Sequence, residues 1–197
     1  QAAIWKKLVD GKLETPDTWE VSLSGGADKK ETFERLMSEG KLGALAFLRN
    51  LRNMQQAGVP KEMVSLYASA ADVSKVLPFR YVAAARVVPA WEDVIDEMLL
   101  RSCAQREKLP GKTIVIVDAS GSMHNGNVSA KSDMSRLDAA GALAAILRES
   151  CDDCRLYATA GSDGQGIHAT MEVPARRGMA LVDMFSKDAF ASKIGGG

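Results

Sequence analysis

Residues 113–122 (TIVIVDASGS) constrain the fold more than any other part of the chain. Five β-favouring residues lead directly into Asp118, and Ser120 and Ser122 follow it at alternate positions. A continuous apolar run between polar, glycine-containing segments is typical of a strand buried on both faces of a parallel sheet. In open α/β sheets ligands bind at the carboxyl ends of such strands, so Asp118 stands where this fold class places its functional groups.

The oxygen atoms of this loop indicate a metal site. Mg²⁺ prefers oxygen ligands, keeps several waters and often takes only one or two carboxylates directly. We therefore expect Asp118, Ser120 and Ser122 to bind Mg²⁺ or a similar divalent cation. A polar turn that only caps the next helix is one alternative. A phosphatase or receiver-type aspartate is another, although a phosphatase would want a second aspartate at the position of Ser120.

The chain before this strand has a different pattern. Up to about residue 108 apolar residues recur with a helical period, and no strand pattern interrupts them. Predicted helices cover about 29–39, 42–56, 61–70, 77–88 and 90–106 and are joined by turns rich in glycine and proline. This pattern favours a helical solenoid or bundle without a clean internal repeat. Leu109-Pro110-Gly111 has the composition of a linker and marks the domain boundary.

An α/β unit is predicted after the boundary. A helix is expected over about 135–150 and strands over 155–159 and 167–173, with a glycine-rich hairpin loop at 161–166 between the strands. Short helices are expected over 178–185 and 188–193. Residue 1 lies within a helical pattern and the last residues are glycines, so we expect both the helical part and the α/β part to be incomplete in this chain.

Composition sets limits on partners and location. Lys+Arg and Asp+Glu both number 25, so a nucleic-acid surface must be a local patch. No apolar run approaches the ~18 residues of a membrane span, so we expect no membrane partner. The three cysteines do not form a disulfide framework, and a reducing, cytoplasmic location is the simpler expectation.

Catalytic interpretations have little support. A serine nucleophile needs a histidine base, and His124 and His168 are the two histidines of the chain. His168 falls inside a predicted strand, and G-x-S-x-G is absent. Cys151 and Cys154 have the C-x-x-C spacing, but zinc would want a second pair, and a redox motif normally opens a helix instead of closing one. We expect two unrelated thiols and no enzyme activity.

Basic residues in the helical part suggest contacts to RNA. Cationic side chains interspersed with amides, without nearby acids, are suited to hold phosphates and stack on bases. The alternative is an ordinary solvated helix face. The expected RNA-binding residues are Lys29, Lys30, Arg49, Arg52, Asn53, Arg80 and Arg86.

The combination of this helical region with D-x-S-G-S resembles the Ro ribonucleoprotein family. Its members join a ring of HEAT-like helical repeats, the TROVE module, to a von Willebrand factor A domain with a metal-ion-dependent adhesion site. The resemblance is carried by residues 42–45 (LGAL), 48–54 (LRNLRNM), 78–80 (PFR), 83–86 (AAAR) and 111–123 (GKTIVIVDASGSM). It implies the C-terminal part of a TROVE module over 1–108, a linker over 109–111 and the N-terminal part of an A domain over 112–197.

The resemblance also implies a function. Members of the family bind small noncoding Y RNAs and the single-stranded ends of misfolded RNAs, and they serve RNA quality control without catalysis. In A domains a threonine and an aspartate on two further loops complete the metal site, and here they would lie beyond Gly197. The contrasting interpretation is an A domain that recruits a protein ligand, as in AAA+ or maturation machinery, without RNA binding.

Overall fold

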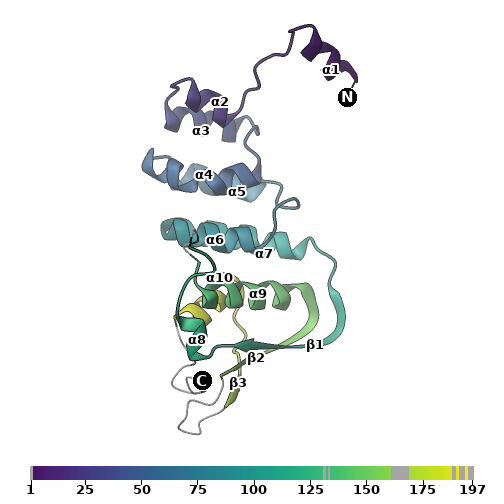
Figure 1. The fold of residues 1–197 in the computed structure, drawn as a ribbon, viewed down its shortest axis with the longest axis vertical. Coiled ribbons are helices and arrows are strands. Elements are labelled where there is room, and N and C mark those ends of the chain that lie inside the picture. The colour runs from purple at the N-terminus through teal and green to yellow at the C-terminus, as the bar shows by residue number, and fades with distance from the viewer. Residues whose placement is uncertain are drawn as a thin grey trace.

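The computed structural model describes residues 2–130, 132, 134–160, 169–187, 190 and 194. In it, short helices stack in layers along the long axis of the molecule, and a small sheet lies at one end of the stack (Figure 1). The helical part contains α1 (Ala2–Val9), α2 (Trp19–Ser24), α3 (Lys29–Ser38), α4 (Ala44–Gln56), α5 (Lys61–Ala70), α6 (Phe79–Val87), the 3-10 turn η1 (Pro89–Trp91) and α7 (Glu92–Ala104). The remaining elements are β1 (Leu109–Asp118), α8 (Gly121–His124), α9 (Arg136–Ser150), β2 (Cys151–Thr159), β3 (Thr170–Glu172) and α10 (Gly178–Ser186).

The helices lie in successive layers, α2 with α3, α4 with α5 and α6 with α7 (Figure 1). α2 packs on α3 and α6 packs on α7, and α3 contacts both α4 and α5. α4 packs on α6 and α5 packs on α7, so each pair covers the apolar side of the next. The short helix α1 projects from the end of the stack, with Ile4, Trp5 and Leu8 exposed. The predicted helical period is therefore confirmed, and most of the helical stability comes from packing of these apolar faces between layers.

Local signals account for the helix ends. Asp28 begins α3, because its side chain accepts a hydrogen bond from Glu31 N at 2.9 Å. Glycines with positive φ follow the ends of α3 and α4, at Gly40 (φ 65°) and Gly58 (φ 74°). Because capping residues and glycines of this kind are visible in the sequence, the predicted helix at 42–56 agrees closely with the observed helix Ala44–Gln56.

The sheet is small and mixed. β1 and β2 pair in parallel, and β2 pairs with β3 in an antiparallel manner, which gives the order β1-β2-β3. α9 connects the two parallel strands and packs on both of them. α10 lies against α9, where a side chain at Gly141 would meet the Val182 backbone at 3.0 Å. The absence of a side chain at Gly141 thus allows α9 and α10 to pack closely.

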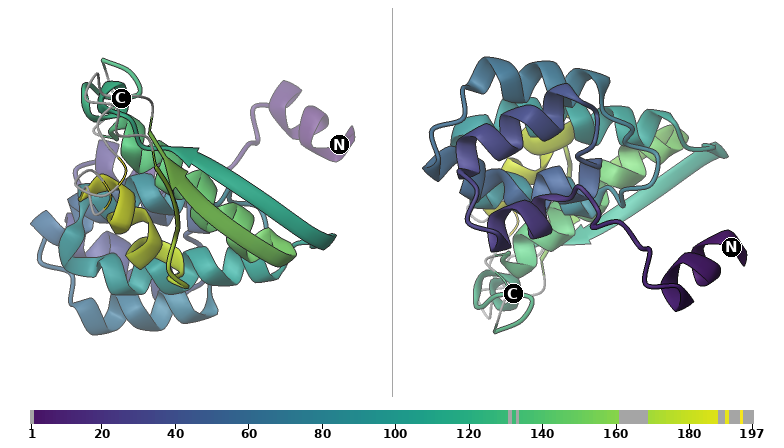
Figure 2. Two further views of the ribbon diagram at one scale, coloured as in Figure 1. Left: turned by 90° about the horizontal axis from the view of Figure 1, so that it is seen from below. Right: turned by 90° about the horizontal axis from the view of Figure 1, so that it is seen from above.

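Two features of β1 differ from the sequence-based expectation. The strand begins at Leu109, so the expected linker 109–111 lies inside the strand, with a register shift between Leu109 and Lys112. The strand is also not buried on both faces, because Ile114 and Ile116 are 67% and 64% exposed. α9 covers the opposite face, and the described part of the chain places no helix over the side of Ile114 and Ile116. Seen from below, the strands cross in front of the helices (Figure 2).

Other expectations lie outside the described residues: the hairpin loop at 161–166, His168 and the helix at 188–193. Cys151 and Cys154 both belong to β2, directly after α9, and are free thiols together with Cys103. No helix among the described residues has the length and apolar character to cross a membrane.

Candidate metal loop and RNA-binding residues

The loop after β1 brings three oxygen-bearing side chains together at the carboxyl end of the parallel strand pair. Asp118 is the last residue of β1 and is in register with Thr159 of β2. Its Oδ1 atom accepts a hydrogen bond from Ser120 N at 2.8 Å. The Oγ atoms of Ser120 and Ser122 lie 3.2 Å apart. The three predicted ligand residues therefore share one short loop, and Asp118 and Ser122 are exposed to solvent.

The donor set fits a hard cation that keeps part of its water. It offers one carboxylate and two hydroxyls, and no donor within the described residues contacts Asp118 Oδ2. The described residues contain no group of three or more His, Cys, Asp or Glu side chains suited to hold a metal. One carboxylate with two hydroxyls is a donor set of the kind that Mg²⁺ takes together with several waters, whereas zinc takes His, Cys and carboxylate ligands.

The far end of the loop is held by the beginning of α9. Arg136 Nη1 donates a hydrogen bond to Ser122 O at 3.1 Å, and Asn127 and Ser135 form an antiparallel bridge. Ser135 and Asp138 form a capping box at the start of α9. The beginning of the loop is held by β2 instead, because Ala119 N donates a hydrogen bond to Thr159 O at 2.8 Å.

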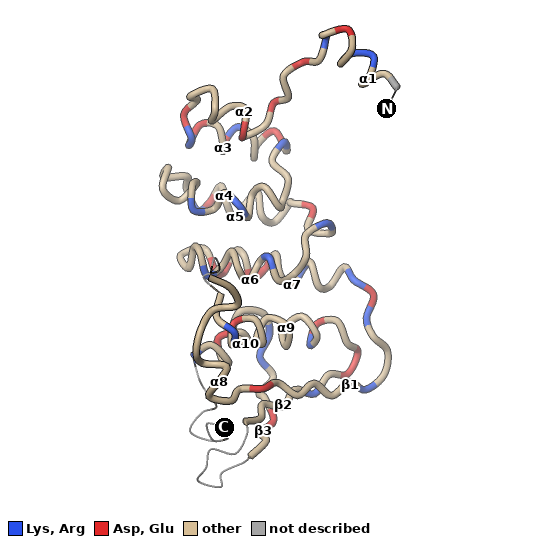
Figure 3. Tube along the Cα trace, in the orientation of Figure 1, with Lys and Arg blue, Asp and Glu red and all other residues tan. Residues whose placement is uncertain are grey.

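Most of the predicted RNA-binding residues lie on the surface of the stack. Lys29 and Lys30 are in the first turn of α3, Arg49 and Arg52 are on α4, and Arg80 is at the start of α6; all five are exposed. They therefore occupy three successive layers, although lysines and arginines alternate with acids over the whole molecule (Figure 3). Lys30 and Asn53 have partners close by. The Lys30 Nζ atom lies 3.9 Å from Glu34 Oε1, and Asn53, which is half-buried, donates to Asn50 Oδ1 at 3.0 Å.

Arg80 has an aromatic neighbour. Its guanidinium carbon lies 5.0 Å from the ring centroid of Phe79, which is 40% exposed. An exposed ring beside a cation is the arrangement that single-stranded nucleic acids use for stacking. Phe79 was not among the predicted RNA-binding residues, although its position next to Arg80 is visible in the sequence.

Arg86 requires a correction, because its side chain is committed to contacts inside the protein. Its Nε atom donates to Asp138 Oδ1 at 2.8 Å, and its Nη2 atom donates to Asp183 Oδ1 at 2.7 Å and to Ser186 Oγ at 2.9 Å. Glu92 Oε2 lies 3.4 Å from Nη1. With only 19% of its side chain exposed, Arg86 is not placed to hold a phosphate. Its partners Asp138 and Asp183 lie 52 and 97 residues away in the sequence, so spacing along α6 gave no sign of them.

The pKa values of Asp138 and Asp183 beside Arg86 are lowered, whereas that of Glu92 is raised. Burial alone would raise the pKa of Asp138, but hydrogen bonds from Ser135 and Arg86 outweigh it and lower the pKa. The pKa of Asp183 is lowered in the same way, because hydrogen bonds from Lys187 and Arg86 exceed the effect of burial. Glu92 differs: burial and the charge of Asp183 raise its pKa. Asp138 and Asp183 are thus held as carboxylates against Arg86.

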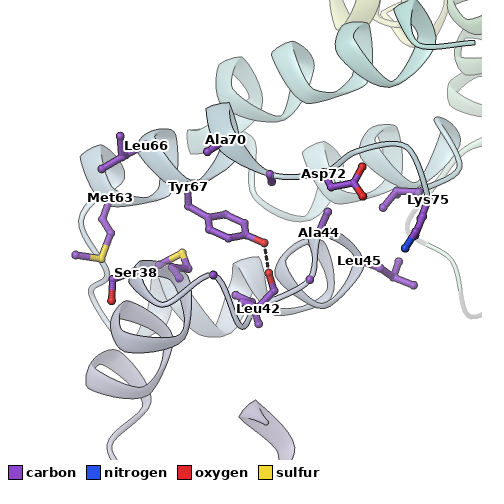
Figure 4. A pocket seen from close by; sticks show the side chains of 15 residues that line it. Ser38, Leu42, Ala44, Leu45, Met63, Leu66, Tyr67, Ala70, Asp72 and Lys75 are labelled. Atoms are coloured by element: carbon purple, nitrogen blue, oxygen red, sulfur yellow. Dashed lines mark hydrogen bonds between the residues drawn. The ribbon is translucent and has the colours of Figure 1, made fainter. Parts of the chain in front are cut away.

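An apolar pocket in the helical stack was not predicted from the sequence. It has a volume of about 810 Å³ and lies between the α3–α4 connection, α4, α5 and the segment after α5 (Figure 4). Beside the pocket, the Tyr67 hydroxyl donates a hydrogen bond to Leu42 O. The ring centroids of Phe47 and Tyr67 are 4.8 Å apart. Burial raises the pKa of Tyr67 to about 12, so the hydroxyl stays a donor at neutral pH. Leu45 and Leu66, which line the pocket, are exposed.

The sequence of this chain is similar to a known protein family and to two proteins with established names. The family model of the TROVE domain matches residues 3–136. Telomerase protein component 1 of Mus musculus is 29% identical over 111 residues, which cover 53% of this chain and 4% of that protein. The Rattus norvegicus protein of the same name is 27% identical over 111 residues, again 53% of this chain and 4% of that protein.

The fold also has a counterpart among crystal structures. The Deinococcus radiodurans Ro (RSR) protein superimposes with a TM-score of 0.57 at 18% identity. The match covers 82% of this chain and 36% of that protein. At this identity the likeness concerns the fold alone, and the chain spans about a third of that structure.

The TROVE match covers more than half of the chain and extends past the expected boundary at residue 108. It contains the helical layers from α1 to α7 as well as β1 and the Asp118 loop. The sequence motifs, the stacked helices and the structural likeness agree with it. The chain therefore belongs to the TROVE-domain family, the family of the Ro ribonucleoproteins.

Proposed function

We propose that this chain is part of a non-catalytic RNA-binding protein of the cytoplasm, in which the helical stack supplies RNA contacts and the Asp118 loop binds Mg²⁺. Membership of the TROVE-domain family is the observation that carries the RNA-binding part. The RNA class is small noncoding RNA of the Y type or the single-stranded ends of misfolded RNA, and the role is RNA quality control. The α/β part belongs to a domain of the von Willebrand A type.

Exposed cations in three layers support RNA contacts on the stack. Lys29, Arg49 and Arg80 are all exposed, and the described residues offer Arg49 and Lys29 no acidic partner. Phosphate contacts by such side chains give affinity without sequence preference and make binding depend on salt. Phe79, next to Arg80, adds an exposed ring on which a base would stack.

A binding measurement tests this assignment. Single-stranded RNA with a fluorescent label should increase in anisotropy when the chain is added at low salt. In Arg49→Gln/Arg80→Gln the affinity should fall for every RNA sequence, and the slope of log affinity against log salt should decrease by about one for each phosphate that is no longer bound. No RNA binding by the wild type at low salt would remove the RNA-binding proposal.

Lys61→Gln is the matched control for these substitutions. Lys61 is an exposed cation of the same stack, but its Nζ atom already lies 2.7 Å from Asp93 Oδ2. Its removal should leave both the affinity and the salt slope nearly unchanged. An equal loss of RNA affinity in Lys61→Gln would mean that binding depends only on the net charge of the chain.

The chemistry of the Asp118 loop supports the Mg²⁺ site. Asp118 would supply the carboxylate ligand, and Ser120 and Ser122 would supply hydroxyl oxygens or hold water ligands. When bound, the cation supplies a positive charge at the end of the sheet, where an acidic group of a partner would complete its coordination. The exposure of Asp118 and Ser122 supports access to such a partner.

The charge of Asp118 is the feature to test for the metal site. Asp118→Asn keeps an oxygen that accepts the hydrogen bond of Ser120 N, at 2.8 Å in the wild type, but it removes the carboxylate. Mg²⁺ should raise the melting temperature of the wild type and leave that of Asp118→Asn unchanged. Equal stabilisation of both proteins by Mg²⁺ would locate the cation elsewhere. Asp152→Asn, an exposed carboxylate near the other end of β2, is the control.

The same loop favours a second candidate function, recruitment of a protein ligand without RNA binding. An acidic peptide whose carboxylate joins the cation would then bind in the presence of Mg²⁺ and be released by a chelator. Failure to bind RNA combined with this Mg²⁺-dependent peptide binding would favour the recruitment function over the RNA-binding one.

A further inference from the structure

We infer that Arg86 is a positioning residue for the metal loop: from α6 it fixes the beginning of α9, which in turn holds Ser122. This role rests on the Mg²⁺ site proposed at Asp118. It also gives a task to a side chain whose predicted RNA role the structure argues against. The inference follows from four consecutive sets of contacts between Arg86 and Ser122.

The first set joins Arg86 to α9 and α10. Arg86 extends from α6, and its guanidinium donates to Asp138 Oδ1 of α9 at 2.8 Å and to Asp183 Oδ1 of α10 at 2.7 Å. The planar guanidinium serves both carboxylates at once, which a lysine ammonium on the same helix would do poorly. Arg86, with a largely buried side chain, thereby joins the α/β part to the last helix pair of the stack.

The second set lies inside the capping box of α9. Asp138 uses its other oxygen, Oδ2, to accept from Ser135 N at 3.1 Å and from Ser135 Oγ at 2.8 Å. Ser135 Oγ in turn accepts from Asp138 N at 2.9 Å. The carboxylate of Asp138 therefore both caps α9 and binds Arg86. A displacement of the Arg86 guanidinium would consequently disturb the first turn of α9.

The third and fourth sets lead from that turn to the metal loop. The segment before α9 folds back on the loop, with Val128 N donating to Met134 O at 2.9 Å and Asn127 bridging Ser135. Arg136, the first residue of α9, then donates through Nη1 to Ser122 O at 3.1 Å. Ser122 is thus the proposed ligand whose backbone depends on α9.

Asp118 does not share this dependence. Its place is set by the register of β1 with β2, where it pairs with Thr159, and by the hydrogen bond from Ala119 N to Thr159 O at 2.8 Å. Loss of the Arg86 contacts should therefore displace Ser122 and leave Asp118 in place. A specific effect of Arg86 on Ser122 can therefore be distinguished from a general loss of stability, which would affect both ends of the loop.

A Mg²⁺ titration of the full chain by calorimetry tests the inference. Arg86→Lys keeps the charge and loses the forked contacts, and it should weaken Mg²⁺ binding about tenfold, the lower end of the effect of residues that orient metal ligands. In the Ser122→Ala background the same substitution should change the affinity by less than about twofold, because the ligand that Arg86 positions is already gone.

Arg101→Lys is the structural control. The Arg101 guanidinium donates to Ala68 O at 2.6 Å and to Ala71 O at 2.7 Å, so it stabilises the stack without contacting α9. This variant should lose stability and keep the Mg²⁺ affinity of the wild type. As a second readout, hydrogen exchange at the amides of residues 126–128 should become faster in Arg86→Lys, whereas exchange along β1 should not change.

The outcomes are distinguishable. A wild type that does not bind Mg²⁺ overturns the metal site itself and, with it, this role of Arg86. A wild type that binds Mg²⁺ and a folded Arg86→Lys that binds it equally well overturn only the positioning role. An equally large effect of Arg86→Lys with and without Ser122 would also overturn it, because the contacts through α9 would then not be the route.

Discussion

Two arginines of the helical stack show how surroundings decide the role of a residue. Arg49 lies on α4 and Arg86 on α6, and both were expected to contact RNA. Arg49 is exposed, whereas Arg86 contacts Asp138 and Asp183 and keeps 19% of its side chain exposed. A buried guanidinium surrounded by carboxylates is costly to separate from its partners. Arg86 is therefore a structural residue and Arg49 a surface one.

The stability that Arg86 provides should depend on pH. The folded-state pKa values of Asp138 and Asp183 lie below the ordinary 3.8, so their contribution is complete above that pH and is lost as the pH falls below it. Arg86→Met should lower the free energy of unfolding by about 3 kcal/mol near pH 7. The difference from wild type should shrink as the pH falls below 3.8, because the unfolded chain then takes up protons at both acids more readily than the folded protein does.

Urea unfolding of wild type and Arg86→Met, at neutral pH and below pH 3.8, measures this prediction. Glu92 also faces Arg86, but burial raises its pKa, so it takes up its proton at higher pH and its contribution has the opposite sign. Arg49→Met, at an exposed position, should change stability by less than about 0.5 kcal/mol at either pH. A difference for Arg86→Met that is independent of pH would mean that the methylene packing of Arg86, and not its ion pairs, stabilises the fold.

Gly178 is a described glycine at which both a positive φ and a close neighbour oppose a side chain. It begins α10 with φ of 52°, and an added Cβ would lie 2.8 Å from Asp96 Cγ of α7 and would overlap its Oδ1 atom. That oxygen accepts from Met179 N at 2.7 Å. Gly178→Ala should therefore lower the free energy of unfolding by at least about 2 kcal/mol, from backbone strain and disruption of this hydrogen bond. Gly43→Ala is the control in the same denaturant titration, because Gly43 has ordinary φ (−71°) and open space around it.

At the scale of elements, α9 connects the main parts of the molecule. Its first turn contacts Arg86 and the metal loop, and its body packs on β1, β2 and α10. This first turn depends on the side chain of Ser135, the N-cap residue. The start of α9 is thus the place where a local change in the sequence should have an effect on a distant element.

Ser135→Ala tests the importance of that helix start. Loss of the capping hydroxyl should cost about 1 kcal/mol of unfolding free energy. The same change should also weaken Mg²⁺ binding at the proposed site, because the first turn of α9 holds Ser122. Ser150→Ala, at the other end of α9, should do neither. A Ser135→Ala protein with full Mg²⁺ affinity would show that the loop does not need the cap.

The elements differ in how far the sequence predicted them. The helix at Ala44–Gln56 and the strand that ends at Asp118 were predicted because their signals are local: apolar period, glycine turns and a run of β-branched residues. The exposure of Ile114 and Ile116 was not predicted, because it depends on which helices cover the sheet. The three proposed metal ligands were found from five consecutive residues, whereas the partners of Arg86 lie on elements far along the chain.

At the scale of the molecule, the stack and the α/β part share one hydrophobic core. Buried residues form a single cluster that runs from Phe33 in α3 through Trp91 and Met98 to Leu156 in β2 and Phe185 in α10. α9 and α10 follow α6 and α7 as a further helical layer (Figure 1). The boundary near residue 109 is thus a change of secondary structure within one packed body, which agrees with a TROVE match that continues to residue 136.

A shared core predicts that the two parts unfold together. Asp96 lies on α7, and its Oδ1 atom accepts from Met179 N of α10, so Asp96→Ala removes a hydrogen bond between the parts and leaves a buried N–H without its partner. The expected cost is about 1–3 kcal/mol. Native-state hydrogen exchange should report this cost equally for the slowest amides of α7 and of β2, because global unfolding exposes both. If protection fell in β2 and α10 while α7 kept its wild-type values, the α/β part would unfold on its own and the core would be two units in contact.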